Sequence, residues 1–261
     1  MSERIVAVDR ALEILELLHK ERRPVGVSEI SRELGLNKST VHRCLASLEY
    51  KGFVRQDYET GRYSLGMKLL AMGLGLKEEL NVVELISNHT KYLHEQTGEA
   101  VNVSVLEESP EKGYLTIMVH KEWSRNSVLT ANPDLGSSVE AYTSSVGKCL
   151  LAFNPNYDEK IMEANGFTKY TPNTISSIEE FRRELEEVRK NGYAIDNQEL
   201  EIGLFCIGVP IFNGKGEVIA GISISGPVSR IKEGNLEDKV KLLKEVSKAI
   251  SEDIGDLKIT K

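Results

Sequence analysis

Two short helices joined by a tight turn are predicted by residues 27–51, VSEISRELGLNKSTVHRCLASLEYK, and no other segment constrains the fold as strongly. Ser28 is placed to cap the first helix, and Gly35 to end it in the left-handed conformation common there. Asn37 is placed to cap the second. Apolar residues of the second helix recur at spacings of three and four, which predicts a buried face of Val41, Cys44, Leu45 and Leu48. This pattern is typical of a DNA-reading helix-turn-helix.

The opposite face of the second helix carries side chains that can donate hydrogen bonds to phosphates and base edges. We expect base contacts in the major groove from Ser39, Thr40, His42 and Arg43, and a phosphate contact from Lys38. This face makes double-stranded DNA the expected partner of the N-terminal region.

A β-hairpin follows, because β-type runs flank the turn-forming residues 57–61. It resembles the wing of a winged helix and carries Arg55 and Arg62, of which we expect Arg62 on the phosphate backbone. A helical hairpin of an enzyme is the alternative interpretation of residues 27–51. The wing and the N-terminal position favour DNA binding.

The net charge of −7 is unevenly distributed along the chain. Residues 1–80 carry 13 Lys and Arg against 12 Asp and Glu, whereas the remainder carries 20 against 28. Phosphate affinity depends on the local basic face, so an acidic second part reduces nonspecific DNA binding without excluding a reader module.

Composition indicates a cytoplasmic protein without metal or cofactor. No apolar run approaches the roughly 18 residues of a membrane helix, and the charged N-terminus does not resemble a signal peptide. Three scattered cysteines, Cys44, Cys149 and Cys206, lack the spacing of a zinc site and imply reduced thiols.

The length of 261 residues allows two domains. Residues 5–20 predict an amphipathic helix that completes the helix-turn-helix core with an apolar stripe of Val8, Ala11, Leu12, Leu15 and Leu18. We therefore assign residues 1–65 to a winged helix-turn-helix domain and residues 66–80 to a linker helix. The linker has too many apolar residues for an isolated solvated helix, so we expect it to pack against a second subunit.

Residues 81–261 predict an α+β domain. Its first helix begins at Asn81, which forms a capping-box pattern with Glu84. Hairpins are expected over residues 99–121 and 202–225, with helices over 144–153, 158–165 and 236–254 and a further helix capped by Ser176 and ended by Gly192. This order suggests a mostly antiparallel sheet covered on one face by helices.

Short patterns that imitate enzyme motifs do not satisfy the chemistry they would need. Gly147-Lys148 lacks the Ser or Thr of a phosphate loop, and Ser145-x-x-Lys148 lacks the companion motifs of β-lactam-binding enzymes. Residues 221–226 resemble a nucleophile elbow but read better as a strand, and the scattered histidines indicate no metal site. We expect no enzyme activity.

The order of parts resembles the IclR family of bacterial transcription regulators over nearly the whole chain. The resemblance depends on four spaced motifs besides the recognition segment Asn37-Lys-Ser-Thr-Val-His-Arg43. These are Thr143-Ser-Ser-Val-Gly-Lys148, Gly192-Tyr-Ala-Ile-Asp-Asn-Gln-Glu199, Gly203-Leu-Phe-Cys206 with Val209-Pro210, and Gly221-Ile-Ser-Ile-Ser-Gly226. It implies a GAF-like C-terminal domain, residues 81–261, with a curved sheet that binds a small-molecule effector, in dimers or tetramers on palindromic promoter sites.

The resemblance also implies which residues hold the effector: Ser145, Val146, Asp196, Cys206, Ser223 and Ser225. Two of these, Ser223 and Ser225, are two apart on one strand and so share a face. The first turn of the helix near Ser145 offers free amides for a carboxylate, which suggests a small carboxylic acid or sugar acid. Serine hydroxyls bonded to neighbouring backbone remain the structural alternative for each residue.

We therefore expect a ligand-responsive transcription regulator, with repression the commoner mode in the family. Residues 196–199, Asp-Asn-Gln-Glu, have amides where many members have further acids, so specificity can differ. The competing interpretation is a DNA-binding module whose C-terminal domain serves only oligomerisation.

Overall fold

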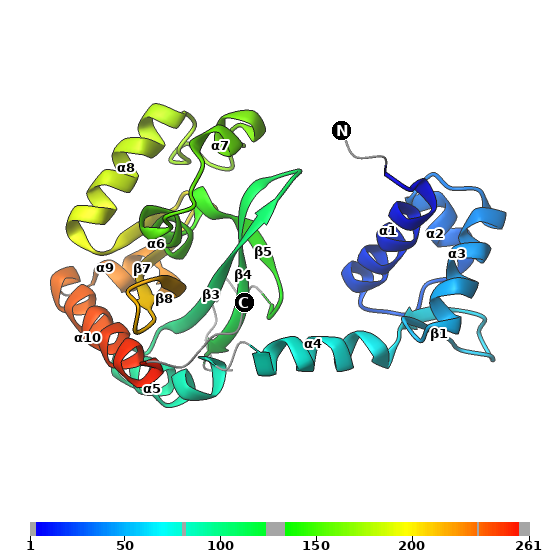
Figure 1. Cartoon of the computed structure of the whole chain (residues 1–261), viewed down its shortest axis with the longest axis horizontal. Helices are drawn as coiled ribbons and strands as arrows, with labels where there is room; N and C mark the ends of the chain where they lie inside the picture. Colours follow the sequence, from blue (N-terminus) through cyan, green and yellow to red (C-terminus); the bar gives the residue numbers. More distant parts are fainter. Residues whose placement is uncertain (1–3, 80–81, 124–133, 234, 256–261) are drawn as a thin grey trace. The chain divides into compact units, whose positions relative to one another are not determined.

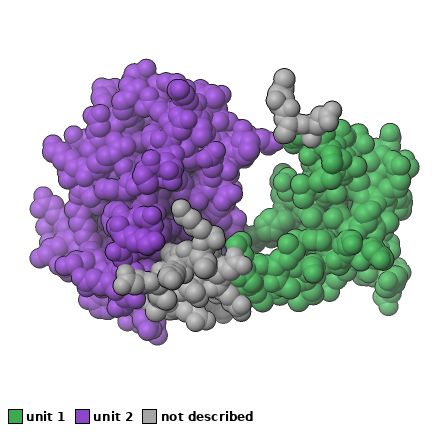
Figure 2. All heavy atoms as spheres, in the orientation of Figure 1, with its two compact units in different colours: residues 1–80 green, residues 81–261 purple. Residues whose placement is uncertain are grey.

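The computed structural model describes residues 4–79, 82–123, 134–233 and 235–255. The chain forms two compact units, residues 1–80 and residues 81–261, coloured separately in Figure 2. Each has its own hydrophobic core and is described by itself.

The smaller unit contains three helices and a two-stranded wing. These are α1 (Val6–Glu21), α2 (Val27–Glu33), α3 (Lys38–Tyr50) and the antiparallel strands β1 (Val54–Gln56) and β2 (Tyr63–Leu65). The four apolar residues expected beneath α3 are all buried. The helix-turn-helix and the wing are therefore where the sequence predicts them.

Local details of the smaller unit differ from expectation. Gly35 has the predicted left-handed backbone, with φ +63°, but Gly26 and not Ser28 is the N-cap of α2. Asn37 is the N-cap residue of α3, although its side chain makes no capping hydrogen bond. Capping serine and asparagine side chains compete with other partners and with water, so sequence identifies the turn more reliably than the bond.

The apolar stripe predicted for α1 is partly right. Leu18 is buried and Ala11 and Leu15 pack partly buried against the core, but Val8 and Leu12 are each 51% exposed. Ile14 and Leu17, which were not predicted, complete the buried face. Apolar residues cover much of the circumference of α1, so periodicity admits more than one stripe. Packing of α1 against α3 selected the one observed.

Helix α4 (Met67–Glu79) follows the wing, as predicted for the linker. The start of α4 is anchored next to the wing: the amide of Gly66, just before the helix, donates to the Phe53 carbonyl, and the amide of Lys68 donates to the Gly52 carbonyl. Five apolar side chains of α4 are more than half exposed in the single chain: Met67, Leu70, Met72, Leu74 and Leu76. Exposed apolar side chains of this number on one helix are the kind that subunit association covers.

The larger unit has a six-stranded antiparallel sheet of order β5-β4-β3-β8-β7-β6, curved around helices (Figure 1). Its strands are β3 (Ala100–Ser109), β4 (Gly113–Glu122), β5 (Ser138–Glu140), β6 (Ala194–Asn197), β7 (Leu204–Phe212) and β8 (Val218–Pro227). Its helices are α5 (Val82–Thr97), α6 (Ser145–Phe153), α7 (Glu159–Asn165), α8 (Ile178–Asn191), α9 (Val228–Lys232) and α10 (Leu236–Ile254). The α+β class and both long hairpins agree with the sequence analysis.

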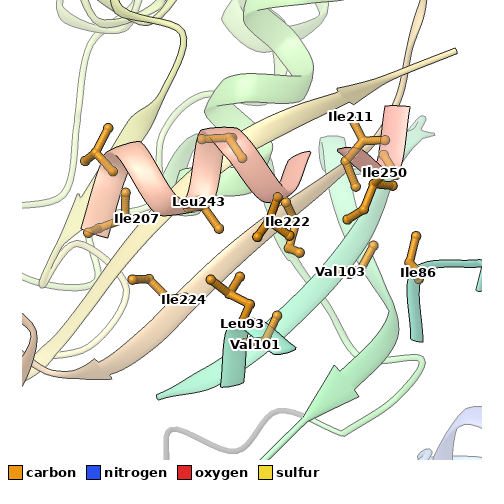
Figure 3. Close-up of a cluster of buried hydrophobic side chains, with 14 of the residues drawn as sticks. Ile86, Leu93, Val101, Val103, Ile207, Ile211, Ile222, Ile224, Leu243 and Ile250 are labelled. Carbon is orange, nitrogen blue, oxygen red and sulfur yellow. The ribbon is translucent and has the colours of Figure 1, made fainter. Parts of the chain in front are cut away.

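Helices cover both faces of this sheet, so the expectation of one covered face is wrong. Helices α5 and α10 pack on one face, over Val103, Ile222 and Ile224 (Figure 3). Side chains alternate along strands, so the neighbouring residues Asn102, Ser223 and Ser225 face the other side. Helix α6 contacts β3, β6, β7 and β8 there. The glycines and serines in the strand sequences did not predict that α6 covers the second face of the sheet.

Two further details correct or limit the sequence analysis. Ser177 caps α8 by accepting from the Glu180 amide, one residue after the predicted Ser176. Asn81 and the side chain of Glu84, the predicted capping box of α5, lie outside what the structure describes. Short β5, β6 and α9 were not predicted. Among the described residues, no helix is long and apolar enough to cross a membrane.

Candidate functional site

A cavity of about 370 Å³ lies between the sheet of the larger unit and the start of α6. Residues from all six strands contribute to its lining. All six residues predicted for effector binding are among them: Ser145, Val146, Asp196, Cys206, Ser223 and Ser225. The structure thus brings together side chains that are up to 80 positions apart in the sequence.

Strand register explains why these side chains meet. Asp196 of β6 is paired with Cys206 of β7, and Cys206 is paired with Ser225 of β8. Directly paired residues point to the same face of a sheet, so the three form a row across it. Ser223 belongs to the next row, paired with Gly208 on one side and Asn102 on the other.

Glycines allow the first turn of α6 to lie directly on the sheet. A Cβ atom at Gly208 would be 2.7 Å from the carbonyl carbon of Ser145, and one at Gly221 would meet the side chain of Val146. Ser144 caps α6 by accepting from the Gly147 amide. The remaining first-turn amides have no carbonyl partner within the helix, which makes this end of α6 suited to an anionic group.

Asp196 provides the buried carboxylate of the cavity. It is 2% exposed, and its Oδ1 accepts a hydrogen bond of 2.7 Å from the Glu199 amide. Burial raises the pKa of Asp196 to about 6. Burial and the Asp196 carboxylate raise the pKa of the Cys206 thiol well above its ordinary value. Cys206 is therefore a protonated thiol and not a reactive thiolate.

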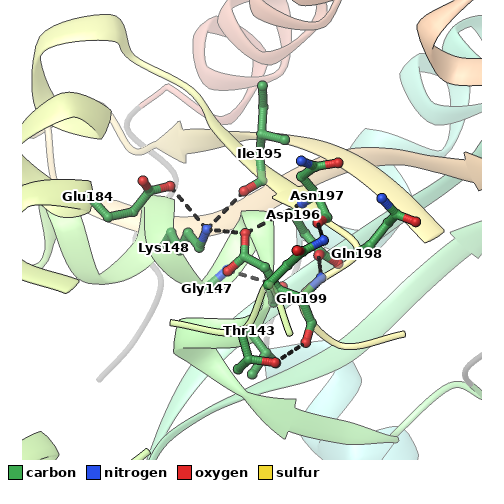
Figure 4. Close-up of polar contacts among 12 residues, drawn as sticks. Thr143, Gly147, Lys148, Glu184, Ile195, Asp196, Asn197, Gln198 and Glu199 are labelled. Carbon is green, nitrogen blue, oxygen red and sulfur yellow. Dashed lines mark hydrogen bonds and ion pairs between the residues drawn. The ribbon is translucent and has the colours of Figure 1, made fainter. Parts of the chain in front are cut away.

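Behind the cavity wall, Lys148 forms a buried charge network (Figure 4). Its Nζ donates to Glu199 Oε1 at 2.7 Å, to Glu184 Oε1 at 3.0 Å and to the Ile195 carbonyl at 2.9 Å. Burial favours the neutral amine, but the two carboxylates outweigh it and raise the pKa of Lys148. Lys148 therefore ties α6 to α8 and to the segment after β6, and all three of its donors are used.

Several cavity residues were not found from the sequence. The unpredicted polar ones are Asn102, Ser104, Thr116, Ser137, Thr143, Ser144 and Glu201. Asn102, Ser104 and Thr116 are polar positions within otherwise apolar strands, a pattern visible in the sequence. Only the pairing of β3 with β8 shows that this pattern faces the same cavity as Ser223.

The exposed face of α3 carries the predicted DNA contacts. Lys38, Ser39, His42 and Arg43 are exposed and Thr40 is half-buried, opposite the apolar residues of the same helix. No acidic residue lies in the first turn of α3. This face is chemically suited to phosphates and base edges.

Arg62 is less free to contact a DNA phosphate than the sequence analysis suggested. Its guanidinium pairs with Glu29 at 2.9 Å and donates to the Pro24 carbonyl at 3.1 Å. The same carboxylate also pairs with Arg23 at 2.9 Å. Arg62 thus joins the wing to α2, and exposed Arg55 on β1 is the freer basic side chain of the wing.

The described part of the chain contains no candidate metal site. No group of three or more His, Cys, Asp or Glu side chains there could hold a metal ion. The three cysteines are buried and free.

Family comparisons match both units. The profile for the bacterial transcriptional regulator IclR C-terminal domain matches residues 76–252, and that for the IclR helix-turn-helix domain matches residues 7–58. The chain belongs to the IclR family. It is a DNA-binding transcriptional regulator and not an enzyme, in agreement with the failure of each catalytic motif in its sequence.

Two relatives align with this chain over nearly its whole length. The chain is 32% identical over 252 residues to the HTH-type transcriptional regulator KdgR of Escherichia coli K12, and the alignment covers 96% of this chain and 93% of KdgR. It is 29% identical over 250 residues to the transcriptional repressor IclR of the same organism, covering 94% and 90%.

Solved structures agree with the fold. The crystal structure of the Thermotoga maritima IclR matches with a TM-score of 0.72 and 33% identity, covering 95% of this chain and 98% of that one. An IclR homolog from Microbacterium hydrocarbonoxydans, complexed with 4-hydroxybenzoate, matches with a TM-score of 0.79 and 24% identity, covering 95% and 98%. The latter similarity supports the fold.

Proposed function

We propose that this protein is a promoter-binding repressor whose DNA affinity is controlled by a small organic acid bound in the sheet cavity. One observation carries the proposal. All six residues expected to bind an effector line a single cavity, together with the first turn of α6. A cavity of about 370 Å³ is in the size range of small-molecule sites.

The α6 end of the cavity favours a carboxylate in the effector. First-turn amides and the helix dipole attract an anion, and Ser145 lines the cavity at that position. The homolog that was crystallised with 4-hydroxybenzoate, a carboxylate, lends support to this class. A sugar acid belongs to the same class and fits the serine-rich lining.

DNA recognition is assigned to the smaller unit. In this proposal residues 1–65 are the winged helix-turn-helix, residues 66–80 the linker helix and residues 81–261 the effector domain. Ser39, Thr40, His42 and Arg43 read bases in the major groove, and Lys38 contacts phosphate. Arg62 contributes to the phosphate surface chiefly by holding the wing in place. A promoter-binding protein works where the DNA is, in the cytoplasm.

Oligomerisation is assigned to the exposed apolar side chains of α4. They exceed what a monomer commonly leaves uncovered on one helix, so we propose that a second subunit covers them and presents a second recognition helix. A two-fold dimer binds a palindromic site, and a tetramer repeats that arrangement.

Sedimentation tests the α4 interface. The double substitution Leu70→Glu and Leu74→Glu places charges on this face and should convert the oligomer to monomer. The matched control Lys68→Glu changes an exposed side chain on the same helix and should leave the oligomer intact. An unchanged sedimentation coefficient for the double variant would assign the interface elsewhere.

The effector proposal is tested by thermal shift of the full chain with a panel of small carboxylates and sugar acids. A ligand at 100 times its dissociation constant stabilises by roughly 2.7 kcal/mol. The expected hit also changes the affinity of the protein for its selected operator, since an effector must distinguish two states to shift them. Stabilisation that is unchanged in Ser223→Ala and Ser225→Ala would contradict the site, and no hit would favour a C-terminal domain that serves only oligomerisation.

A further inference from the structure

The β3 side of the effector cavity contains polar groups that the protein itself leaves without partners. Ser104 is 7% exposed and Ser223 is 4% exposed, and both line the cavity. Among the described residues, neither hydroxyl makes a hydrogen bond, and both hydroxyls are open to the cavity. Two hydroxyls that face one cavity and are not used by the protein are available to a ligand.

Asn102 lies between these two serines. It is directly paired with Ser223 across β3 and β8, and it precedes Ser104 by two residues on the same face of β3. Its Nδ2 donates to Ser225 Oγ at 3.0 Å. Its Oδ1 is buried and has no partner among the described residues.

The hydrogen bond to Ser225 sets how the Asn102 amide is used. Its nitrogen Nδ2 faces the Ser225 hydroxyl and donates to it. The amide oxygen Oδ1, which can only accept, is therefore left for another donor.

The charge of the lining limits what can satisfy these groups. Its charged residues are the two acids Asp196 and Glu201, and none of the described lining residues is Lys, Arg or His. One carboxylate can be held by the α6 amides, but a second anionic group would be placed in an acidic, largely buried wall at a high cost. A neutral hydroxyl both donates and accepts, which matches an amide oxygen flanked by serines.

We infer that Asn102, Ser104 and Ser223 form a hydroxyl-binding subsite, and that the effector is a hydroxylated monocarboxylic acid. This deepens the proposed function and rests on it. The carboxylate lies at the α6 end, and the ligand hydroxyl donates its one hydrogen to Asn102 Oδ1 and accepts from the hydroxyls of Ser104 and Ser223. Asn102 and Ser104 thereby select hydroxy acids over the corresponding acids without the hydroxyl.

The test compares matched pairs of acids by calorimetric titration of the full chain. The pairs are 4-hydroxybenzoate with benzoate and 3-hydroxybutyrate with butyrate, and succinate represents a second carboxylate. A site built to bond a hydroxyl strongly rejects the analogue that lacks it, so at least one hydroxy acid should bind about tenfold or more tightly than its partner. Succinate should bind more weakly than that hydroxy acid.

Two variants identify the residue responsible. Ser104→Ala should reduce the hydroxy-to-deoxy affinity ratio to about threefold or less, chiefly by weakening the hydroxy acid. Thr143→Val is the matched control, because the Thr143 hydroxyl also belongs to the lining but already donates to the Glu140 carbonyl at 2.8 Å. It should leave the ratio unchanged.

Failure of this inference is distinguishable from failure of the proposed function. Equal binding of hydroxy and deoxy acids to the unmodified protein, or a ratio unaffected by Ser104→Ala, would overturn the subsite while leaving a carboxylate effector in place. Absence of binding by every acid of the panel would overturn both. The comparison of ligand pairs on the unmodified protein needs no variant to fold.

Discussion

Substituting Lys148 by Met should strongly destabilise the larger unit. Lys148 is 1% exposed and holds the buried Glu199 carboxylate at 2.7 Å. Removing one partner of a buried ion pair costs about 3–5 kcal/mol, because the other charge stays buried without compensation. Burial already raises the pKa of Glu199 to about 7, so this carboxyl can take up a proton instead. We therefore expect the lower end of the range, about 3 kcal/mol.

Urea denaturation of the full chain, monitored by tryptophan fluorescence, measures this loss of stability in the larger structural unit. The sequence contains one tryptophan, Trp123, which follows β4 in the larger unit and is 40% exposed. With a urea m-value of about 2 kcal/mol per molar for a unit of this size, a loss of 3 kcal/mol lowers the midpoint by roughly 1.5 M.

Two further variants make the reasoning refutable. Lys190→Met on α8 removes a lysine whose side chain is 75% exposed and should change stability by no more than about 0.5 kcal/mol. Lys148→Met combined with Glu199→Gln removes the stranded carboxyl and should recover part of the loss. A midpoint for Lys148→Met equal to that of Lys190→Met, or a double variant less stable than Lys148→Met, would refute the account of a buried charge network.

Three other predictions follow from the structure. Burial raises the pKa of Asp196 to about 6 and that of Glu199 to about 7, above the values of the unfolded chain, so the folded state binds more protons between about pH 4.5 and 7. The tryptophan-monitored urea midpoint should therefore fall as the pH rises from 5.5 to 7.5, and Glu199→Gln should reduce that fall; a midpoint that rises with pH would contradict the sign. Arg43→Ala should relax specificity at one base pair by about 1–3 kcal/mol in operator titrations. Arg62→Ala should weaken binding to all sequences alike, and it should also lower the stability of the smaller unit because it releases the wing. The opposite pattern of DNA binding would exchange the two roles. Gly208→Ala should destabilise the larger unit by about 1–3 kcal/mol, since its Cβ would be 2.8 Å from the Val146 amide, and an unchanged midpoint would show that α6 can shift on the sheet without cost.

Local patterns predicted much of the smaller unit. The turn at Gly35, the helix from Lys38 and the hairpin around residues 57–61 depend on residues close together in the chain, and all three are observed. The same holds for both long hairpins of the larger unit. The buried face of α1 was predicted only in part, because its apolar residues admit more than one stripe and its contact with α3 selects between them.

The cavity between the sheet and α6 shows the same division between local and tertiary information. Motif resemblance identified Ser145, Asp196 and Ser223, because each belongs to a short recognisable segment. Lys148 looked like part of a false phosphate loop until the fold placed Glu184 and Glu199 around its ammonium group.

The sequence by itself determined the elements with short-range signals and the residues inside recognisable motifs, because those depend on hydrogen bonds and side-chain periodicity within a few residues. Tertiary structure alone decided that Asn102 faces Ser223, which is 121 positions away, because strand pairing brings them together across the sheet. It likewise decided that Arg62 pairs with Glu29 and that α6 covers the second face of the sheet. Long-range register, and not local composition, determines which polar side chains share a cavity and which are left for a ligand.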